Sequence, residues 1–302
     1  MGEACAVAVG AEGFGLRGPR GWAFRGVDVE AAPGSLVAVE GPSGSGRTCL
    51  LLALTGRMRP TEGRATVGGR ELPRHMATVR GYSSLAHVPG VTELDPALTV
   101  GEHLLEQALL RRRFQGSLTE SLRELARPRA ERRARARQRA GAALTAAGLD
   151  PSTLPKGTRT AVRDLERLEA LRLSVAMALV GGPRLLGVDD VDLKLSDAER
   201  AEAWALLRSL AASGITVVAV CSEAPGGDVT VVSTAPRNGN DAGPAHTPPV
   251  GPAEPAAAAA DAEETVPPPA QDHGDQIDHA DHADHADHDK ETADALAETR
   301  RA

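Results

Sequence analysis

Residues 41–48 limit the possible folds more than any other part of the chain, because they read Gly-Pro-Ser-Gly-Ser-Gly-Arg-Thr. They match the phosphate-binding pattern G-x-x-x-x-G-K-[ST], except that arginine replaces lysine. An apolar run, Ser35–Glu40, precedes them, and the apolar stretch Cys49–Arg57, with the composition of a helix, follows. Glycines let successive backbone N–H groups point at an anion, and a helix N-terminus adds partial positive charge. The pattern therefore predicts an anion-binding loop between a strand and a helix. Its candidate binding residues are Gly41, Pro42, Ser43, Gly44, Ser45, Gly46, Arg47, Thr48 and Cys49.

Two side chains of this loop carry specific expectations. Thr48 is expected to place its hydroxyl on Mg²⁺. Arg47 keeps the positive charge of lysine, but its guanidinium is broader and planar, whereas an ammonium is compact. We therefore expect phosphate binding with less accurate placement of the γ-phosphate. The alternative is a glycine-rich turn that binds no ligand.

Strand-like and helix-like segments alternate along residues 1–235. The expected strands are Cys5–Val9, Trp22–Glu30, Ser35–Glu40, Arg64–Val67, Ser84–Val88, Arg184–Val188, Ile215–Cys221 and Val229–Ser233. The expected helices after the one at Cys49–Arg57 are Leu98–Phe114, Ser117–Ala147, Thr158–Val180 and Ser196–Ala212. Such alternation predicts an α/β fold with a largely parallel sheet. The helical block at about 92–180 is expected to be an inserted subdomain.

The last part of the chain differs in composition from the rest. Residues 225–302 hold 16 acidic and 4 basic residues, a net of −12, whereas the preceding residues have a net charge of +5. Residues 236–270 are mostly Pro, Ala, Gly and acids, which cannot bury enough apolar surface to offset chain entropy. We therefore expect 1–235 to form one folded domain and 236–302 to be a disordered acidic tail.

An Asp-His-Ala repeat occupies residues 278–289 of this tail. Its imidazoles recur every three residues, so an extended helix with three residues per turn aligns them. Neutral imidazoles suit Zn²⁺, Ni²⁺ or Cu²⁺. The candidate metal ligands are His279, His282, His285 and His288. The alternative is a low-complexity, solubilising tail.

Cysteine usage and hydropathy bear on the cell compartment. Cys5, Cys49 and Cys221 are far apart and form no CxxC pair, which fits a reducing cytosol. No apolar stretch approaches the length of about 20 residues that crosses a bilayer. We expect a cytoplasmic protein, and a membrane process that it serves requires another chain to do the spanning.

An arginine-rich stretch lies in the helical block. Eleven arginines and three glutamates fall between Arg111 and Arg139. Such charge can attract nucleic acid or anionic lipid. However, Phe114 is the one aromatic residue among the arginines. We therefore expect a solvated face of an arm that docks a protein partner, and no nucleic acid.

The segment Leu165–Asp190 reads LERLEALRLSVAMALVGGPRLLGVDD. It resembles the nucleotide-binding subunits of ABC transporters, whose signature stretch LSGGERQRLALARAL is followed by a strand such as GDPRLLLLDE. Residues 60–72 look like the turn and strand after the family's first helix, and residues 87–104 like its Q-loop segment. The resemblance covers about 8–235 and implies a P-loop NTPase fold of ABC type. The matching residues are Leu165, Glu169, Arg172, Leu173, Ala176, Ala178 and Leu179.

The resemblance implies a Mg-ATP site that keeps its loop. Asp189 falls at the position of the family's Mg²⁺-directed carboxylate, which acts with Thr48. Asp190 falls at the position of the catalytic glutamate, but its side chain is one methylene shorter. The aromatic residue that stacks on adenine is expected near Gly18, where there is none, and Trp22 is the candidate substitute.

Other positions of the family's active site carry different residues here. The signature Ser-Gly-Gly falls at Glu166, Arg167 and Leu168. The Q-loop glutamine falls at Gly90, and the switch histidine at Ser222. A carboxylate in the signature repels a phosphate, and a side chain there blocks close approach of backbone. The resemblance therefore implies a degenerate site with weak or absent hydrolysis.

Three classes of function fit these observations. The first is a nucleotide-binding subunit that binds Mg-ATP, pairs with a second cassette as a homo- or heterodimer, and serves a membrane permease from the inner face of the membrane. The second is a non-catalytic nucleotide-sensing or scaffold protein with the same fold. The third, a small-molecule kinase, fits least well because the signature-like helix directly precedes the strand that ends at Asp189.

Overall fold

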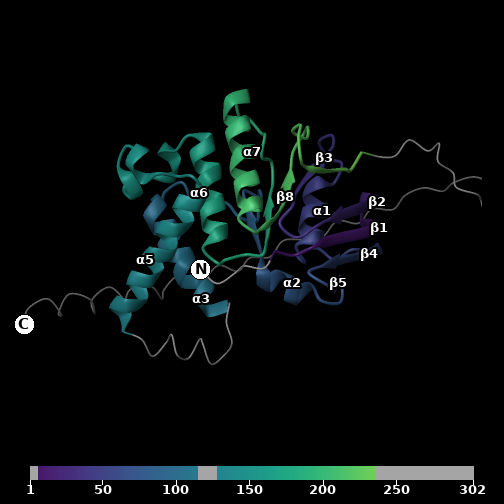
Figure 1. The fold of residues 1–302 in the computed structure, drawn as a ribbon, viewed down its shortest axis with the longest axis horizontal. Helices are drawn as coiled ribbons and strands as arrows, with labels where there is room; N and C mark the ends of the chain where they lie inside the picture. The colour runs from purple at the N-terminus through teal and green to yellow at the C-terminus, as the bar shows by residue number, and fades with distance from the viewer. Residues whose placement is uncertain (1–5, 115–127, 236–302) are drawn as a thin grey trace, which may run out of the picture. The chain divides into compact units, whose positions relative to one another are not determined.

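The computed structural model describes residues 6–114 and 128–235, with backbone alone for 111–114 (Figure 1). The strands are β1 (Val9–Gly18), β2 (Gly21–Ala31), β3 (Leu36–Glu40), β4 (Glu62–Val67), β5 (Arg70–Leu72), β6 (Ser83–Ala86), β7 (Leu185–Val188), β8 (Thr216–Val220) and β9 (Thr230–Ser233). The α-helices are α1 (Arg47–Leu54), α2 (Met76–Tyr82), α3 (Val100–Phe114), α5 (Arg129–Ala146), α6 (Arg167–Leu179) and α7 (Asp197–Ala212). Three 3₁₀ turns are η1 (Pro151–Thr153), η2 (Gly157–Arg159) and η3 (Val162–Asp164).

A parallel sheet with the strand order β6-β7-β8-β3-β9 forms the centre of the fold. Its central strands are apolar on both faces, as strands covered on both sides require. Leu36 and Ala38 of β3 pack into one hydrophobic cluster, and Val37 and Val39 pack into another on the opposite face. The sequence prediction of an α/β fold with a parallel sheet is therefore confirmed.

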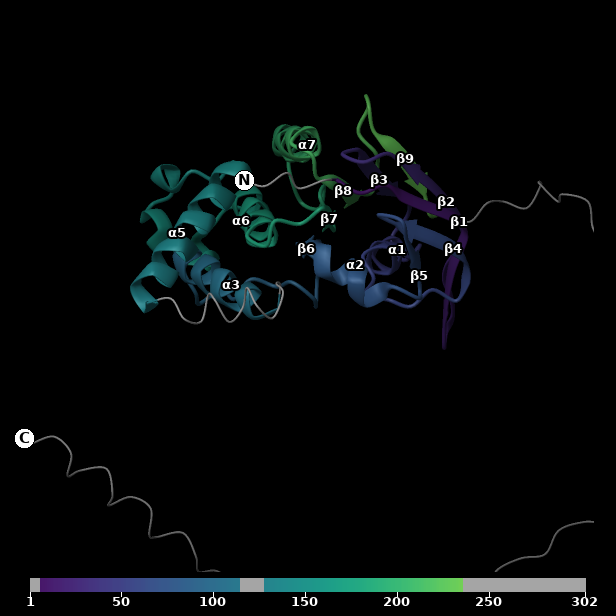
Figure 2. The same ribbon diagram turned by 60° about the horizontal axis from the view of Figure 1, so that its bottom comes forward.

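A second sheet is antiparallel, with the order β2-β1-β4-β5. It covers α1 and one face of the parallel sheet, and Figure 2 shows it on the side opposite α3, α5 and α6. Phe14 and Phe24, from paired strands, bury their rings in this core with centroids 5.7 Å apart. The expected strand Cys5–Val9 is misplaced, since β1 begins at Val9 and contains register shifts that obscure its alternation.

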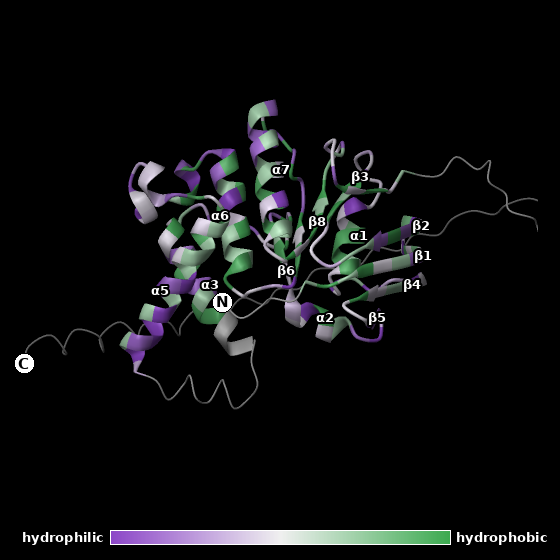
Figure 3. Ribbon diagram, viewed as in Figure 1, coloured by the Kyte–Doolittle hydropathy of each residue, from purple (hydrophilic) through white to green (hydrophobic). Residues whose placement is uncertain are grey.

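Helices α3, α5 and α6 form a helical arm beside the parallel sheet (Figures 1 and 2). The arm packs through small residues, among them the buried Ala136 and Ala143 of α5. Figure 3 shows the arginine-rich end of α5 as hydrophilic, in contrast to α1 and the central strands. None of the helices in the described ranges has both the length and the apolar composition that a membrane crossing needs.

The expected helix Thr158–Val180 is shorter in the structure. Two 3₁₀ turns occupy its first part, and α6 begins at Arg167. Glu166 is the N-cap, and it forms a reciprocal capping box with Glu169. A capping box satisfies backbone N–H groups at a helix start, so it fixes this boundary. The proposed limits of the folded domain at residue 235 and of the inserted subdomain at about 92–180 remain predictions.

Candidate functional site

The loop between β3 and α1 has two glycines, Gly44 and Gly46, whose backbone is left-handed. Gly44 has φ +81° and Gly46 has φ +85°, both in the left-handed region that side chains disfavour. A Cβ atom on Gly46 would overlap the backbone carbonyl of Ala23 in β2, whereas one on Gly44 would meet no atom within 4 Å. The loop therefore packs tightly against β2 at Gly46 and is open at Gly44.

The N-terminus of α1 follows this loop directly. Gly46 is its N-cap and offers no side chain to cap the helix, and the first turn contains no acidic residue. The uncapped N–H groups and the helix dipole therefore present partial positive charge at the end of the loop. This arrangement suits an anion such as a phosphate.

Thr48 and Asp189 meet at the head of α1. Thr48 lies in the first turn of α1, and Asp189 directly follows β7. The Thr48 hydroxyl donates to Oδ2 of Asp189 at 2.7 Å. The other oxygen of Asp189 accepts from the backbone N–H of Asp190 at 3.1 Å. Burial raises the pKa of Asp189, while the Thr48 hydrogen bond opposes that shift. A hydroxyl and a carboxylate that face each other are oxygen ligands of the kind Mg²⁺ takes, so these two residues fit the ion.

Arg47 reaches the carboxyl end of β8. Its Nη1 donates to the backbone carbonyl of Cys221, directly after β8. The backbone N–H of Cys221 in turn donates to the carbonyl of Val39 in β3, at 3.0 Å. The arginine at the lysine position of the motif thus joins the first turn of α1 to the end of β8.

A second connection joins the loop to the end of β9. The hydroxyls of Ser45 and Thr234 lie 2.6 Å apart, and Thr234 also donates to the Glu40 carbonyl at 3.2 Å. A Cβ atom on Gly41 would lie 2.6 Å from the Thr234 hydroxyl. Sequence reasoning missed Thr234, although its place after the closing strand of a parallel sheet could have indicated it, because loops at that edge gather together.

Asp190, at the expected catalytic position, has φ +48° and lines a small pocket beside the start of α6. His87 lines the same pocket and also has a left-handed backbone, with φ +54°. The His87 N–H donates to the Ser174 hydroxyl of α6 at 2.6 Å. Strained non-glycine backbone is uncommon and is often found at functional sites. Sequence reasoning missed His87; the signal available was a histidine directly after a buried strand.

Gly90, the residue aligned with the Q-loop glutamine, lies three positions after His87 and is exposed. Its N–H donates to the Glu93 carboxylate at 2.8 Å. Burial lowers the pKa of His87, Asp190 raises it, and Arg167 lowers it further. The side chain that this segment presents to Asp190 is therefore a half-buried imidazole that favours its neutral form.

The signature positions form the start of α6. Glu166 is exposed and engaged in the capping box, and its own N–H donates to Glu169 at 2.9 Å. Arg167 lines the pocket near Asp190, and Leu168 is buried in the helical arm. Glu166 and Leu168 therefore stabilise the start of α6, the first through the capping box and the second through burial. Ser222, at the switch position, is exposed, and its N–H donates to the carboxylate of Asp192 at 2.8 Å.

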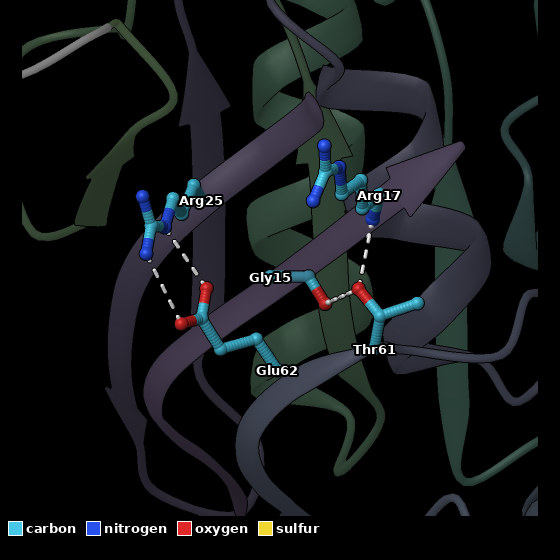
Figure 4. A network of polar contacts seen from close by, with 5 residues as sticks. All are labelled: Gly15, Arg17, Arg25, Thr61 and Glu62. Atoms are coloured by element: carbon cyan, nitrogen blue, oxygen red, sulfur yellow. Dashed lines mark hydrogen bonds and ion pairs between the residues drawn. The ribbon is translucent and has the colours of Figure 1, made fainter. Parts of the chain in front are cut away.

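Trp22, the candidate substitute for an adenine-stacking aromatic, lies on the antiparallel sheet and is 41% exposed. The guanidinium groups of Arg25 and Arg17 lie 4.6 and 5.7 Å from its ring centroid. Arg25 also forms two hydrogen bonds with Glu62, at 2.9 and 3.2 Å (Figure 4). The Trp22 ring, the candidate for stacking on adenine, therefore already makes cation–π contacts with two arginines.

The remaining predictions concern the histidines of the Asp-His-Ala repeat and the three cysteines. His279, His282, His285 and His288 lie outside the described residues, as does Cys5. Within the described ranges, no group of three or more His, Cys, Asp or Glu residues is placed to hold a metal ion. Cys49 and Cys221 are free thiols.

Comparisons with known proteins agree on one family. A family model described as "ABC transporter" matches residues 24–192. The chain is 31% identical to the hemin import ATP-binding protein of Gloeobacter violaceus, over 70% of this chain and 71% of that one. It is 31% identical to Nod factor export ATP-binding protein I of Paraburkholderia xenovorans, over 64% and 55%. It spans about a fifth of the length of longer relatives such as ABC transporter A family member 5 of Arabidopsis thaliana, where the share is 18%.

Solved structures share the fold. A component of an ABC transporter complex from Clostridium perfringens superposes with a TM-score of 0.56 at 19% identity, over 71% of this chain and 78% of that one. A dimeric ATP-binding cassette bound to ADP and Pi superposes with a TM-score of 0.53 at 21% identity, over 71% and 88%. The described helices and strands are thus arranged as in these cassettes.

Proposed function

Since the chain belongs to the ABC transporter family, we propose that it is the nucleotide-binding subunit of a membrane transporter, which binds Mg-ATP and hydrolyses it weakly or not at all on its own. The observation that carries this proposal is the pairing of Thr48 with Asp189 at the end of a glycine loop. The pair supplies oxygen ligands for Mg²⁺ next to backbone N–H groups for phosphate.

The loop binds phosphates through its backbone, so the loss of other side chains leaves this function in place. The uncapped N–H groups at the start of α1, directly after the loop, hold the phosphates, and Thr48 and Asp189 hold Mg²⁺. Mg²⁺ supplies charge neutralisation of the phosphate oxygens when it is bound. The matching of a hydroxyl, a carboxylate and an uncapped helix start supports this assignment.

Weak hydrolysis follows from the residues around the pocket. Asp190 is a short carboxylate on left-handed backbone, so its reach to an attacking water differs from that of a glutamate. A displacement of about 1 Å costs roughly 100-fold in rate, and loss of a positioned general base costs about 10²–10⁴-fold. The start of α6 presents the Glu166 carboxylate, which opposes a phosphate presented by a second subunit.

The contrast between a kept phosphate loop and an altered signature supports a heteromeric arrangement. This chain keeps a phosphate loop but carries Glu166 and Leu168 in place of a glycine-rich helix start. A second cassette with an intact signature could complete the loop, whereas a homodimer would place two carboxylates on two phosphate sites. We propose that such a pair works with a permease at the cytoplasmic face of the membrane.

A non-catalytic nucleotide-sensing or scaffold protein is the second candidate. The loss of the switch histidine at Ser222 and the engagement of Trp22 by two arginines favour it. Co-purification with the product of a neighbouring gene that encodes a multi-span membrane protein distinguishes the two. Stable co-purification supports the transporter subunit, and its absence favours the scaffold.

Titration of the full chain with a fluorescent ATP analogue and Mg²⁺ tests nucleotide binding. We expect saturable binding, and we expect Gly46→Asp to abolish it because a side chain there overlaps Ala23. Gly69→Asp is a matched control, since Gly69 also has positive φ, at +72°, with no atom near its Cβ position. No saturation up to millimolar nucleotide would contradict the proposal.

A further inference from the structure

Three elements hold the residues that follow β8. We call Cys221–Ala224 the edge segment. Arg47 of α1 binds its first carbonyl, at Cys221. Asp192, from the loop after β7, accepts from the Ser222 N–H at 2.8 Å, and Glu40, at the end of β3, accepts from the Ala224 N–H at 3.1 Å.

Arg47 brings a positive charge to a segment that two carboxylates also contact. Two carboxylates, Asp192 and Glu40, bind its N–H groups. The pKa of the Cys221 thiol is raised to about 12, first by burial and then by these two carboxylates, while Arg47 lowers it, so all three charges act at one place. A polyphosphate in the adjacent loop would add negative charge that repels both carboxylates. Arg47 is a cation placed next to the edge segment, in the helix turn that follows the loop.

The guanidinium can serve both sides at once. It has five N–H donors in a rigid fork, and the Cys221 carbonyl occupies one of its two terminal nitrogens. The charge of the guanidinium also lowers the pKa of Asp189, the partner of Thr48, so the group lies within electrostatic reach of the proposed Mg²⁺ ligands as well as of Cys221. A lysine ammonium is a compact point charge without this fork, so it cannot reproduce the bridging geometry.

We propose that Arg47 is a positioning residue that bridges bound phosphate to the Cys221 carbonyl, so that nucleotide binding orders the edge segment. This inference rests on the proposed nucleotide binding and adds to it a route from the loop to the end of β8. Without nucleotide, Arg47 still restrains the segment through the carbonyl. With nucleotide, the phosphate fixes the guanidinium and tightens the restraint, because hydrogen bonds between charged groups are about twice as strong as neutral ones.

Hydrogen–deuterium exchange of the amides of residues 222–224, in the full chain, tests the bridge. In the nucleotide-free state we expect Arg47→Lys to exchange there about tenfold faster than the wild type. Addition of a non-hydrolysable ATP analogue with Mg²⁺ should slow exchange about tenfold in the wild type and leave Arg47→Lys unchanged. Arg80→Lys is the matched control, since Arg80 also donates to a backbone carbonyl, that of Gly56 at 2.8 Å, away from the segment. It should behave as the wild type.

Each outcome decides the proposal. Equal nucleotide-free exchange in wild type and Arg47→Lys would show that Arg47 does not restrain the segment. Faster exchange on nucleotide addition would show that phosphate withdraws Arg47 from Cys221, which also overturns the bridge. If the wild type fails to bind nucleotide in the titration above, the proposed function fails, but the nucleotide-free comparison still tests the restraint. Should Arg47→Lys not fold, Arg47→Gln provides the same comparison, with neutral donors.

Discussion

The Thr48 hydroxyl and the Asp189 carboxylate, 141 positions apart in sequence, form a 2.7 Å hydrogen bond at the end of the parallel sheet. Each residue is fixed by a different element: Thr48 by the first turn of α1, and Asp189 by the end of β7. Asp189 is nearly fully buried, so its carboxylate depends on such partners. Removal of the Thr48 hydroxyl alone is therefore expected to disturb the buried carboxylate.

Thr48→Val should remove the Mg²⁺ dependence of nucleotide binding. Valine keeps the shape of threonine but leaves a buried carboxylate without one donor, which costs about 1–3 kcal/mol of stability. We expect the affinity for the ATP analogue in Mg²⁺ to fall about tenfold or more, with little change in EDTA. Thr48→Ser, which keeps the hydroxyl, should stay close to the wild type. Equal loss in both variants would show that the hydroxyl is not the relevant group.

Gly44→Ala and Gly46→Ala should differ in stability although both glycines have the same backbone conformation. Left-handed backbone costs a non-glycine residue about 1–2 kcal/mol, and both variants bear this cost. Gly46→Ala also forces the loop away from the Ala23 carbonyl, which adds about 1–3 kcal/mol. Chemical denaturation of the two variants measures the difference, and equal unfolding free energies would argue against the tight packing of the loop on β2.

ATP turnover by the pure protein should be well below about 1 s⁻¹, the low end of ordinary enzyme rates. Arg47→Lys alone should not restore it, because Glu166, Leu168 and Asp190 remain unchanged. Steady-state phosphate release measures both proteins. A wild-type rate of about 1 s⁻¹ or more would mean that the substituted positions do not limit catalysis.

Two truncations that differ by two residues should behave differently. A chain that ends at Ala235 should keep the melting temperature and nucleotide affinity of the full chain. A chain that ends at Ser233 lacks Thr234, so Ser45 and the Glu40 carbonyl each lose a hydrogen-bond partner. We expect a loss of about 1 kcal/mol for each. A large fall in melting temperature for the Ala235 truncation would show that residues 236–302 stabilise the fold.

The His87 imidazole should titrate below its ordinary pKa of 6.5, because burial disfavours the charged form. The unfolded chain then binds a proton more readily than the folded one. Stability is therefore expected to fall as the pH decreases from about 6.5 to the folded pKa, and to level off below it. NMR titration of the ring measures the pKa, and His87→Gln should remove this part of the pH dependence. A folded pKa above 6.5 would reverse the sign.

The sequence predicted the fold well where one signal dominated. The glycine pattern at 41–48 and the apolar run of β3 located the loop, and the resemblance to ABC nucleotide-binding subunits is confirmed by the comparisons. Strands buried on both faces were recognised because they are continuously apolar. In contrast, β1 was missed because glycines at Gly10, Gly13 and Gly15 and shifts in register break its alternation.

The site was less predictable because its contacts join distant parts of the chain. The family resemblance implied that Thr48 and Asp189 act together on Mg²⁺, and the structure brings the two side chains together. Nothing in the sequence indicated that Arg47 reaches Cys221, or that Thr234 meets Ser45. These contacts depend on the order of strands in the sheet, which the local pattern does not specify. His87 was overlooked because alignment by spacing favoured Gly90.

The strand order also determines when β3 can pair with its neighbours during translation. The strand that carries the loop, β3, lies between β8 and β9, the last two strands in the described part of the chain. The ribosome makes about 5–20 residues per second, so roughly 10–40 s separate the emergence of Glu40 from that of β9. For most of that interval β3 lacks both neighbours, since β8 emerges only shortly before β9, and Arg47 and Ser45 lack the groups to which they bind. In a nascent chain, the contacts of Arg47 with Cys221 and of Ser45 with Thr234 therefore form only after β8 and β9 have been synthesised.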